Sequence, residues 1–235
     1  MARTKKSTDD APAQPAVGVE ALPRSEQAYR YLRNAIRAGD FKPGDRLREA
    51  DLATAIGLSR TPIREAFARL EANRLVINDP ARGLVVTELD FSAVNELYFM
   101  REVLEGTAAR LAAQHASEVE LSILQDLCEQ YREIATSESQ AGLSLKNRQF
   151  HDMLCQCAHN RYLMDTVNTL HDSLSLLGNS VLTQHDRAHE TLQEHEAVIE
   201  AICRRDPDAA EAAMRQHIRL AQKARMKQIF AQSHL

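Results

Sequence analysis

Residues that stop a helix are rare after Phe91, and this scarcity constrains the fold more than any other feature of the chain. From there to residue 235 the sequence holds only three glycines and one proline, at positions 106, 142, 178 and 207. Apolar side chains recur at spacings of three and four residues, as in amphipathic helices. Short connections between such helices favour an antiparallel bundle. We expect helices at about 91–114, 117–137, 142–158, 160–182, 185–204 and 207–231.

The segment 58–70, LSRTPIREAFARL, is typical of a short helix with an apolar face and a basic face. Its apolar residues recur at i, i+3, i+4 and i+7, whereas Arg60 and Arg64 lie one turn apart on another side. Ser59 is placed to cap the first turn. The shorter amphipathic segment 49–56 ends at a glycine, so the two segments predict a helix-turn-helix. On an isolated helix such arginines would more often form a solvated face, so the flanking segments matter.

Those flanking segments predict a winged helix-turn-helix. Upstream, residues 29–39 form an amphipathic stretch that is followed by a Pro-Gly turn. Downstream, the β-prone runs 75–77 and 84–86 are separated by a turn with a basic tip, which predicts a hairpin. The expected fold class is therefore mostly α, with an N-terminal winged helix-turn-helix and a C-terminal all-helical antiparallel bundle.

The order of these N-terminal elements resembles the winged helix-turn-helix of the GntR family of bacterial transcription regulators. The match runs from Tyr29 to Val86 and is most specific over residues 59–66. The resemblance implies a recognition helix in the major groove and a wing tip against the minor groove. One departure is Ala50, where fatty-acid-responsive relatives often carry an arginine. The resemblance assigns DNA contacts to Arg48, Ser59, Arg60, Thr61, Arg64 and Gly83.

Charge is divided unevenly along the chain. Residues 1–88 hold 15 lysines and arginines against 12 acidic residues, whereas residues 89–235 hold 14 against 21. The positive charge therefore lies where DNA would bind, but an excess of +3 gives only weak, salt-sensitive affinity on its own. We accordingly expect a homodimer on a palindromic, double-stranded operator, as the family resemblance also implies.

The expected domains are a disordered tail over residues 1–22, a DNA-binding domain over 23–89 and a helical effector-binding domain over 90–235. The tail has no apolar block that would make it a signal peptide, and no segment is apolar enough to suggest a membrane partner. The four cysteines show no zinc-knuckle spacing, so reduced thiols are the simplest interpretation. These features predict a cytoplasmic protein.

Three histidines and one amide are expected on inner faces of the bundle. Asn147 and His151 are four residues apart on one helix, His195 lies on the next-to-last helix, and His217 lies on the last. Such a set can surround one divalent transition metal and leave coordination positions free for a ligand. Any one of these histidines could instead be an ordinary core residue.

The surroundings of these residues resemble the FCD effector-binding domain of FadR-type GntR regulators. In the metal-binding members four residues in this arrangement hold the ion, which implies metal ligation by Asn147, His151, His195 and His217. The first of the four is commonly an aspartate, so an asparagine here should weaken binding while still offering a carbonyl oxygen. Zinc is the expected metal, with nickel, manganese or iron as alternatives.

Arg101 falls inside the apolar stripe that Leu97, Met100 and Leu104 suggest for its helix. A guanidinium there needs an anion, and Glu105 one turn on could supply it. In the resembling domain an arginine in this context faces the cavity and helps to hold an acidic effector. The second interpretation is therefore that the fork-shaped guanidinium of Arg101 binds a small carboxylate effector.

We therefore expect a ligand-responsive transcription regulator rather than an enzyme. The first alternative is a metal-dependent, hydrolase-like enzyme that uses the histidine cluster, and the second is a constitutive DNA-binding protein without an effector. No Gly-x-Ser-x-Gly or His-Glu-x-x-His motif supports the enzyme. Glu194 and Glu196 flank His195, but helical spacing predicts that both point to other faces.

Overall fold

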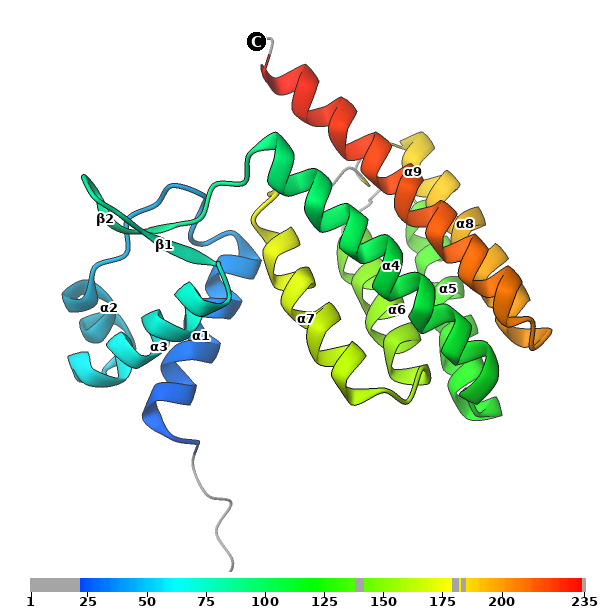
Figure 1. The fold of residues 1–235 in the computed structure, drawn as a ribbon, viewed down its shortest axis with the longest axis horizontal. Helices are drawn as coiled ribbons and strands as arrows, with labels where there is room; N and C mark the ends of the chain where they lie inside the picture. Colours follow the sequence, from blue (N-terminus) through cyan, green and yellow to red (C-terminus); the bar gives the residue numbers. More distant parts are fainter. Residues whose placement is uncertain (1–21, 138–141, 179–181, 183–184, 234–235) are drawn as a thin grey trace, which may run out of the picture.

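The computed structural model describes residues 22–137, 142–178, 182 and 185–233, and it contains an N-terminal and a C-terminal group of elements (Figure 1). The disordered tail expected over 1–22 lies outside the described residues except for Leu22. In chain order the elements are α1 (Arg24–Ala38), α2 (Glu49–Ile56), α3 (Arg60–Ala72), β1 (Val76–Asp79), β2 (Gly83–Val86), α4 (Phe91–His115), α5 (Glu118–Ala135), α6 (Leu143–Cys157), α7 (Arg161–Ser175), α8 (His185–Cys203) and α9 (Pro207–Ser233).

The N-terminal domain is built around α3, whose apolar face is buried as expected. Ile63 and Leu70 are fully buried there, together with Leu32 of α1. Ser59 is the N-cap residue of α3, but the expected side-chain capping bond is absent. The reason is Pro62, which occupies the third helical position and has no N–H to donate to a capping hydroxyl. The Ser59 side chain is thus exposed to solvent.

The wing is an antiparallel hairpin in which Val76 pairs with Val86 and Asp79 with Gly83. At its tip the Asp79 carboxylate accepts hydrogen bonds from the backbone N–H groups of residues 81 and 82, each at 2.8 Å. Gly83 has φ of +78°, a conformation that L side chains rarely adopt. A bridge from Arg46 to Val85 extends the sheet, which the sequence pattern did not predict.

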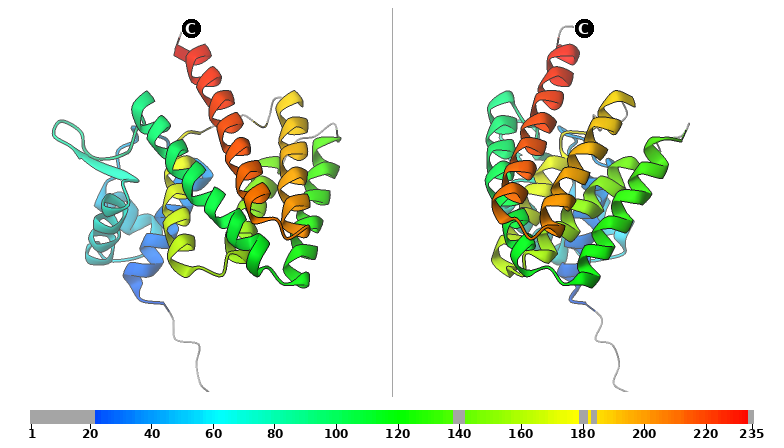
Figure 2. Two further views of the ribbon diagram at one scale, coloured as in Figure 1. Left: turned by 45° about the vertical axis from the view of Figure 1, so that its right-hand side comes forward. Right: turned by 90° about the vertical axis from the view of Figure 1, so that its right-hand side faces the viewer.

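The C-terminal domain is a bundle in which α4 and α9, its two longest helices, lie against each other (Figure 2). Gly106 permits their close approach, because a Cβ there would lie 2.7 Å from Cγ of Arg215. The hairpin of α8 and α9 turns at Asp206, whose carboxylate accepts from the N–H of Ala209 at 3.0 Å, and Pro207 starts α9 as expected. The last turns of α9 extend beyond the other helices.

The expected and observed helices of the bundle agree closely at most ends. The largest difference is α7, which stops at Ser175 instead of continuing to residue 182. Gly178 has φ of +67° after two turn residues, and this left-handed backbone does not continue a helix. Residues 179–181 of the expected helix lie outside the described part of the chain. Among the described helices, none combines the length and the apolar character needed to cross a membrane.

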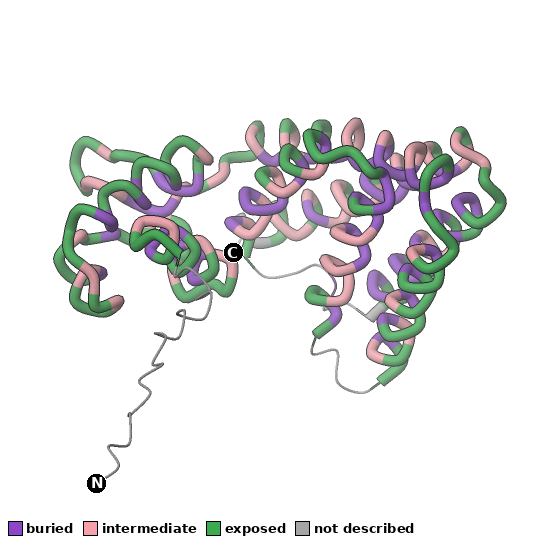
Figure 3. Tube along the Cα trace, turned by 90° about the horizontal axis from the view of Figure 1, so that it is seen from below, coloured by how far each residue is buried: buried purple, intermediate pink, exposed green. Residues whose placement is uncertain are grey.

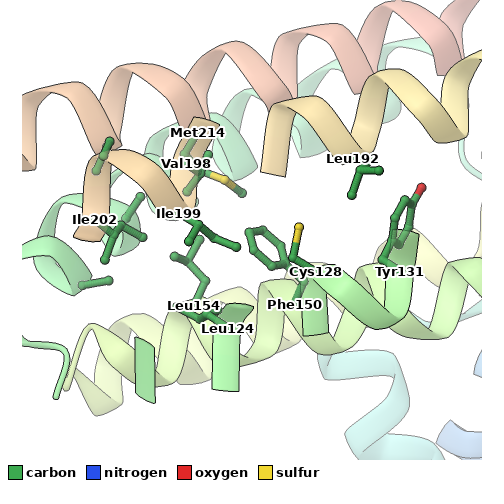
Figure 4. Close-up of a cluster of buried hydrophobic side chains, with 14 of the residues drawn as sticks. Leu124, Cys128, Tyr131, Phe150, Leu154, Leu192, Val198, Ile199, Ile202 and Met214 are labelled. Carbon is green, nitrogen blue, oxygen red and sulfur yellow. The ribbon is translucent and has the colours of Figure 1, made fainter. Parts of the chain in front are cut away.

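Buried residues lie inside both the N-terminal and the C-terminal domain (Figure 3). In the bundle, Phe150 lies beside Cys128 and Ile199, so three different helices meet in one apolar core (Figure 4). The stripe expected on α4 was partly wrong, because Met100 is 40% exposed. The buried line on α4 instead includes Arg101, which places a charged group toward the interior.

The two domains meet where α1 packs against α7 (Figure 1). Arg37 of α1 forms an ion pair with Asp172 of α7, and the aspartate side chain is 5% exposed. Leu176, just beyond α7, is buried in the apolar core of the N-terminal domain. The helix α7 is therefore the element through which the bundle touches the N-terminal domain most directly.

Candidate metal and ligand site

Three histidines from three helices meet in the interior of the bundle. His151 of α6, His195 of α8 and His217 of α9 are all at most 2% exposed. One ring nitrogen from each lies within 4.8 Å of the others. The Nε2 atoms of His151 and His217 are 3.3 Å apart. Two nitrogen ligands on one tetrahedral zinc ion are about 3.4 Å apart, so this pair already has the spacing of shared coordination.

Two buried glutamates orient two of these rings. Nδ1 of His217 lies 2.7 Å from Oε2 of Glu194. Nδ1 of His151 makes a 2.6 Å contact with Oε2 of Glu105, although off the ideal hydrogen-bond direction. A carboxylate accepts a hydrogen bond from Nδ1–H, and in that tautomer Nε2 of each ring carries a lone pair that can bind a metal. Carboxylate partners of this kind are usual behind metal-binding histidines.

The third ring, His195, has no hydrogen-bond partner at either nitrogen among the described residues. It is stacked on Phe150, with ring centroids 3.9 Å apart. Leaving a buried polar group unsatisfied costs about 1–3 kcal/mol. A metal ion in the centre of the cluster would satisfy His195 and would replace the contact between the Nε2 atoms of the other two rings. The residues present therefore fit a divalent transition metal.

The electrostatics favour neutral imidazoles in this cluster. Burial lowers the pKa of His151 to about 4, and burial also lowers the pKa of His195 and of His217. Burial opposes ionisation of Glu105, but Arg101 and His151 nevertheless hold the pKa of its carboxyl well below its usual range. The site thus combines unprotonated rings with ionised carboxylates behind them, which is the state that binds a cation.

A cavity of about 280 Å³ opens beside the cluster, between α4, α6, α7, α8 and α9. His151 and His217 line it, and so do Asn147 and Arg101. Asn147 is half-buried and lies one turn before His151 on α6. Asn147 and Arg101 thus line the same cavity as His151 and His217, whereas His195 belongs to the histidine cluster but not to the cavity wall.

Arg101 is 7% exposed and its Nε lies 2.6 Å from Oε1 of Glu105. The ion-pair partner weighed from the sequence is therefore present. The same guanidinium lines the cavity, so the two interpretations of Arg101 are compatible. Glu105 is shared between Arg101 and His151, which ties the arginine directly to the histidine cluster.

Two further pairings were not predicted from the sequence. Glu194 does not point away from the cluster as expected, since it contacts His217 and is held by Arg187 at 2.6 Å. His171, which had no partner signal, lies 3.3 Å from Glu105 and 3.3 Å from Asp152. The contact of Glu194 with His217 and the contacts of His171 join residues of different helices. Helical spacing carries no information about them, although an acidic residue next to a candidate ligand was a weak signal.

The expected DNA-contacting residues are on the surface of the N-terminal domain. Ser59, Arg60 and Thr61 are exposed at the start of α3, and Arg48 is exposed at the start of α2. Arg64 is exposed and its Nε lies 2.8 Å from Oε2 of Glu49. Gly83 lies at the wing tip and is partly buried.

Two known protein families match this chain. Residues 24–86 match the bacterial regulatory proteins of the gntR family, and residues 96–220 match the FCD domain. YdhC of Bacillus subtilis (strain 168), described as an uncharacterized HTH-type transcriptional regulator, is 34% identical over 193 residues, which cover 82% of this chain and 84% of YdhC.

A second relative and a solved structure are also similar to this chain. The HTH-type transcriptional repressor RspR of Escherichia coli (strain K12) is 30% identical over 197 residues, covering 83% of this chain and 86% of RspR. The solved structure of E. coli McbR/YncC superposes with a TM-score of 0.76 over 89% of this chain and 100% of that chain. At 21% identity this last likeness concerns the fold alone.

Proposed function

Because the chain belongs to the GntR family of bacterial transcription regulators and carries an FCD domain, we propose that it is ligand-responsive and senses a small organic acid at a metal-containing pocket. As a bacterial transcription regulator it acts on DNA in the cytoplasm. Its curated relatives are regulators and not enzymes, so the hydrolase-like alternative is set aside. The observation that carries the proposal is the buried histidine cluster at the wall of the cavity.

The DNA-binding surface is formed by the start of α3, the start of α2 and the wing. Arg60 and Thr61 are free to reach the major groove because both are exposed on the first turn of α3. The ion pair of Arg64 with Glu49 is also exposed. An exposed pair contributes only about 0–1 kcal/mol, so Arg64 can exchange its partner for a phosphate or a base. Arg48 and Gly83 contact the backbone and the minor groove in this arrangement.

In the bundle, His151, His195 and His217 would hold the metal, with Asn147 as an oxygen ligand. Zinc is the first choice, and nickel, manganese or iron are alternatives, since three imidazoles suit all but manganese well. A bound ion supplies a Lewis acid for one carboxylate of the effector. Glu105 and Glu194 hold the rings in position, and Arg101 would donate a hydrogen bond to the same carboxylate.

The signal reaches the DNA-binding domain through α7. His171 of α7 contacts Glu105, which contacts His151, and the next residue, Asp172, pairs with Arg37 of α1. An acid that enters the cavity therefore touches groups that are one contact away from the domain border. In a homodimer on a palindromic operator, a shift of α7 changes the relation of the two recognition helices.

Metal analysis of the purified protein tests this proposal. We expect about one transition-metal ion per chain in the wild type and its loss in His195→Gln, with the fold checked by circular dichroism. His115→Ala is the matched control, because His115 is exposed at the end of α4. If the wild type is instead folded, contains no metal and shows no shift in melting temperature with small carboxylic acids, the three histidines are ordinary core residues. That outcome would leave a constitutive DNA-binding protein.

A further inference from the structure

The segment between α1 and α2 runs along the wing as a third strand. The backbone N–H groups of Gly44 and Leu47 both donate to carbonyl oxygens of β2, each at 2.9 Å. Between them Arg46 is bridged in antiparallel fashion to Val85. Arg46 is therefore fixed to the sheet by backbone hydrogen bonds on both sides, and it belongs to the wing although it lies far from the hairpin in the sequence.

This register determines where the Arg46 side chain lies. Residues opposite each other in an antiparallel pair share a face of the sheet, and so do alternate residues of one strand. Arg46, Val85 and Gly83 are therefore on one face, and Leu47 is buried on the other. A Cβ added to Gly83 would lie 3.7 Å from Nη2 of Arg46. The side chain thus extends across Val85, which is 1% exposed, and places its guanidinium over the wing-tip glycine.

The exposed guanidinium of Arg46 forms no ion pair or hydrogen bond with any residue that the structure describes. Its neighbours differ in this respect. Arg82 at the wing tip pairs with Asp79 at 3.2 Å, and Arg64 of α3 pairs with Glu49 at 2.8 Å. Arg46 therefore offers its full charge and all its donors to a ligand without first giving up a carboxylate partner.

The wing tip and the start of α3 lie on the same side of the N-terminal domain (Figure 1). A helix fills the major groove of DNA, which is about 12 Å wide, so a hairpin beside that helix meets the neighbouring minor groove. The minor groove is only about 6 Å wide, and it admits an extended side chain rather than a helix. Arginine suits it, because a guanidinium is weakly hydrated and a narrow minor groove has a strongly negative potential.

We propose that Arg46 is a further DNA-contacting residue, whose guanidinium enters the minor groove beside the wing. Narrow minor grooves are typical of A·T tracts, and the minor-groove edges of the bases distinguish A·T from G·C pairs but little else. The operator therefore carries A·T pairs under the wing, outside the bases that α3 contacts. This proposal rests on the proposed function, since it takes the start of α3 and the wing as the DNA-binding surface.

Selection of binding sites from a random DNA library by the full-length protein tests the role of Arg46. The wild type should enrich a core sequence flanked by A·T pairs, and Arg46→Gln should enrich the same core without these flanks. On the wild-type site, Arg46→Gln should bind at least about tenfold more weakly, as the loss of a charge-assisted contact implies. Replacing the flanking A·T pairs by G·C pairs should weaken binding of the wild type but not of the variant.

A second variant separates DNA contact from packing. Arg46→Met keeps an unbranched apolar stem over Val85 and removes only the charge and the donors. Its melting temperature should match that of the wild type, and its preference for A·T flanks should be lost as in Arg46→Gln. Arg74→Gln is the matched control, because Arg74 is exposed, has no ion-pair partner among the described residues and follows the other end of α3. It should keep both the affinity and the flanks.

Two results would overturn the role of Arg46 alone. In the first, the wild type enriches a core sequence without A·T flanks, and in the second, the flanks persist in Arg46→Gln and Arg46→Met. A wild type that enriches no sequence, with or without small carboxylic acids, would instead contradict the proposed DNA-binding surface as a whole.

Discussion

At the scale of single residues, the site depends on carboxylates that do not face the cavity. Glu105 lies between Arg101, His151 and His171, and Glu194 lies between Arg187 and His217. Each glutamate holds one imidazole with its Nε2 toward the centre of the cluster. Burying such a carboxylate is favourable only because it is paired on more than one side. The glutamates therefore determine how well the histidines are positioned for a metal.

Replacing Glu105 or Glu194 by glutamine should weaken metal binding by about 10–100-fold, because the ring partner loses its charge. Competition with a chromogenic chelator measures this change. Glu102→Gln serves as control, since Glu102 lies on α4 but pairs with Arg219. Equal metal affinity in Glu105→Gln and Glu102→Gln would show that Glu105 has no role in orienting His151.

On the DNA-binding surface, Arg60→Ala and Arg64→Ala should abolish specific operator binding and leave metal content unchanged. Both side chains are exposed on α3 and neither supports the core. Fluorescence anisotropy with an operator selected from a random DNA library measures the affinity. Arg30→Ala on α1 is the control, because Arg30 is exposed, pairs with Glu26 and is not among the residues expected to contact DNA. Loss of metal in either α3 variant would contradict separate DNA-binding and ligand-binding domains.

At the scale of elements, the sequence was most informative about helices and least informative about contacts between them. The scarcity of glycine and proline after Phe91 predicted the bundle, and the spacing of apolar residues predicted the buried face of α3. Local signals also placed the start of α9 at Pro207. The early end of α7 was missed because the backbone conformation of Gly178 is not visible in a spacing pattern.

The histidines were found because each shares a helical face with apolar residues, together with the family resemblance. Glu105 was considered because it is four residues from Arg101. Glu194 was misplaced because its partner, His217, lies 23 residues away on another helix. Such contacts depend on how helices cross, and helical periodicity alone does not give that geometry.

The start of α5 provides a test of pH dependence at the element scale. Glu120 closes a capping box with Ser117 and also lies 2.9 Å from His159. The backbone N–H of Ser117, followed by His159, lowers the pKa of Glu120 from 4.5 to about 2. A carboxyl whose pKa is lower in the folded state stabilises the fold above its unfolded value of 4.5, and this contribution is lost as the pH falls from there toward 2.

Glu120→Gln should therefore lower the free energy of unfolding at pH 7 by about 1 kcal/mol, the size of a capping contribution. The difference from the wild type should shrink near pH 3. Urea unfolding at both pH values measures it, with Glu118→Gln on the same turn as control. A difference that is the same at both pH values would show that the ionised form of Glu120 is not what stabilises α5.

At the scale of the whole molecule, α7 connects the cavity beside the histidine cluster with the DNA-binding domain. Its His171 faces Glu105 in the bundle, and Asp172 pairs with Arg37 of α1 at the domain border. Leu176 anchors the end of α7 in the N-terminal core. The two domains thus share a packed border, and any displacement of α7 must change that border.

The double variant Arg37→Met, Asp172→Asn should uncouple the domains. It removes both charges together, so no unpaired buried charge remains. Metal content and acid binding should match the wild type, while the effect of the acid on operator affinity should largely disappear. Anisotropy titrations with and without acid measure this coupling, and Arg30→Ala again serves as control. Undiminished coupling would mean that the signal crosses the border elsewhere.

Operator affinity tests the central claim most directly. It is measured for the metal-loaded and the metal-free wild type, with and without the small carboxylic acid that raises the melting temperature most. We expect the acid to change the operator affinity of the metal-loaded protein by at least about fivefold, the lower end of typical coupling between sites. The metal-free protein should show no such change. The same response in both forms, or no response in either, would contradict metal-dependent sensing of an acid as the signal that controls DNA binding.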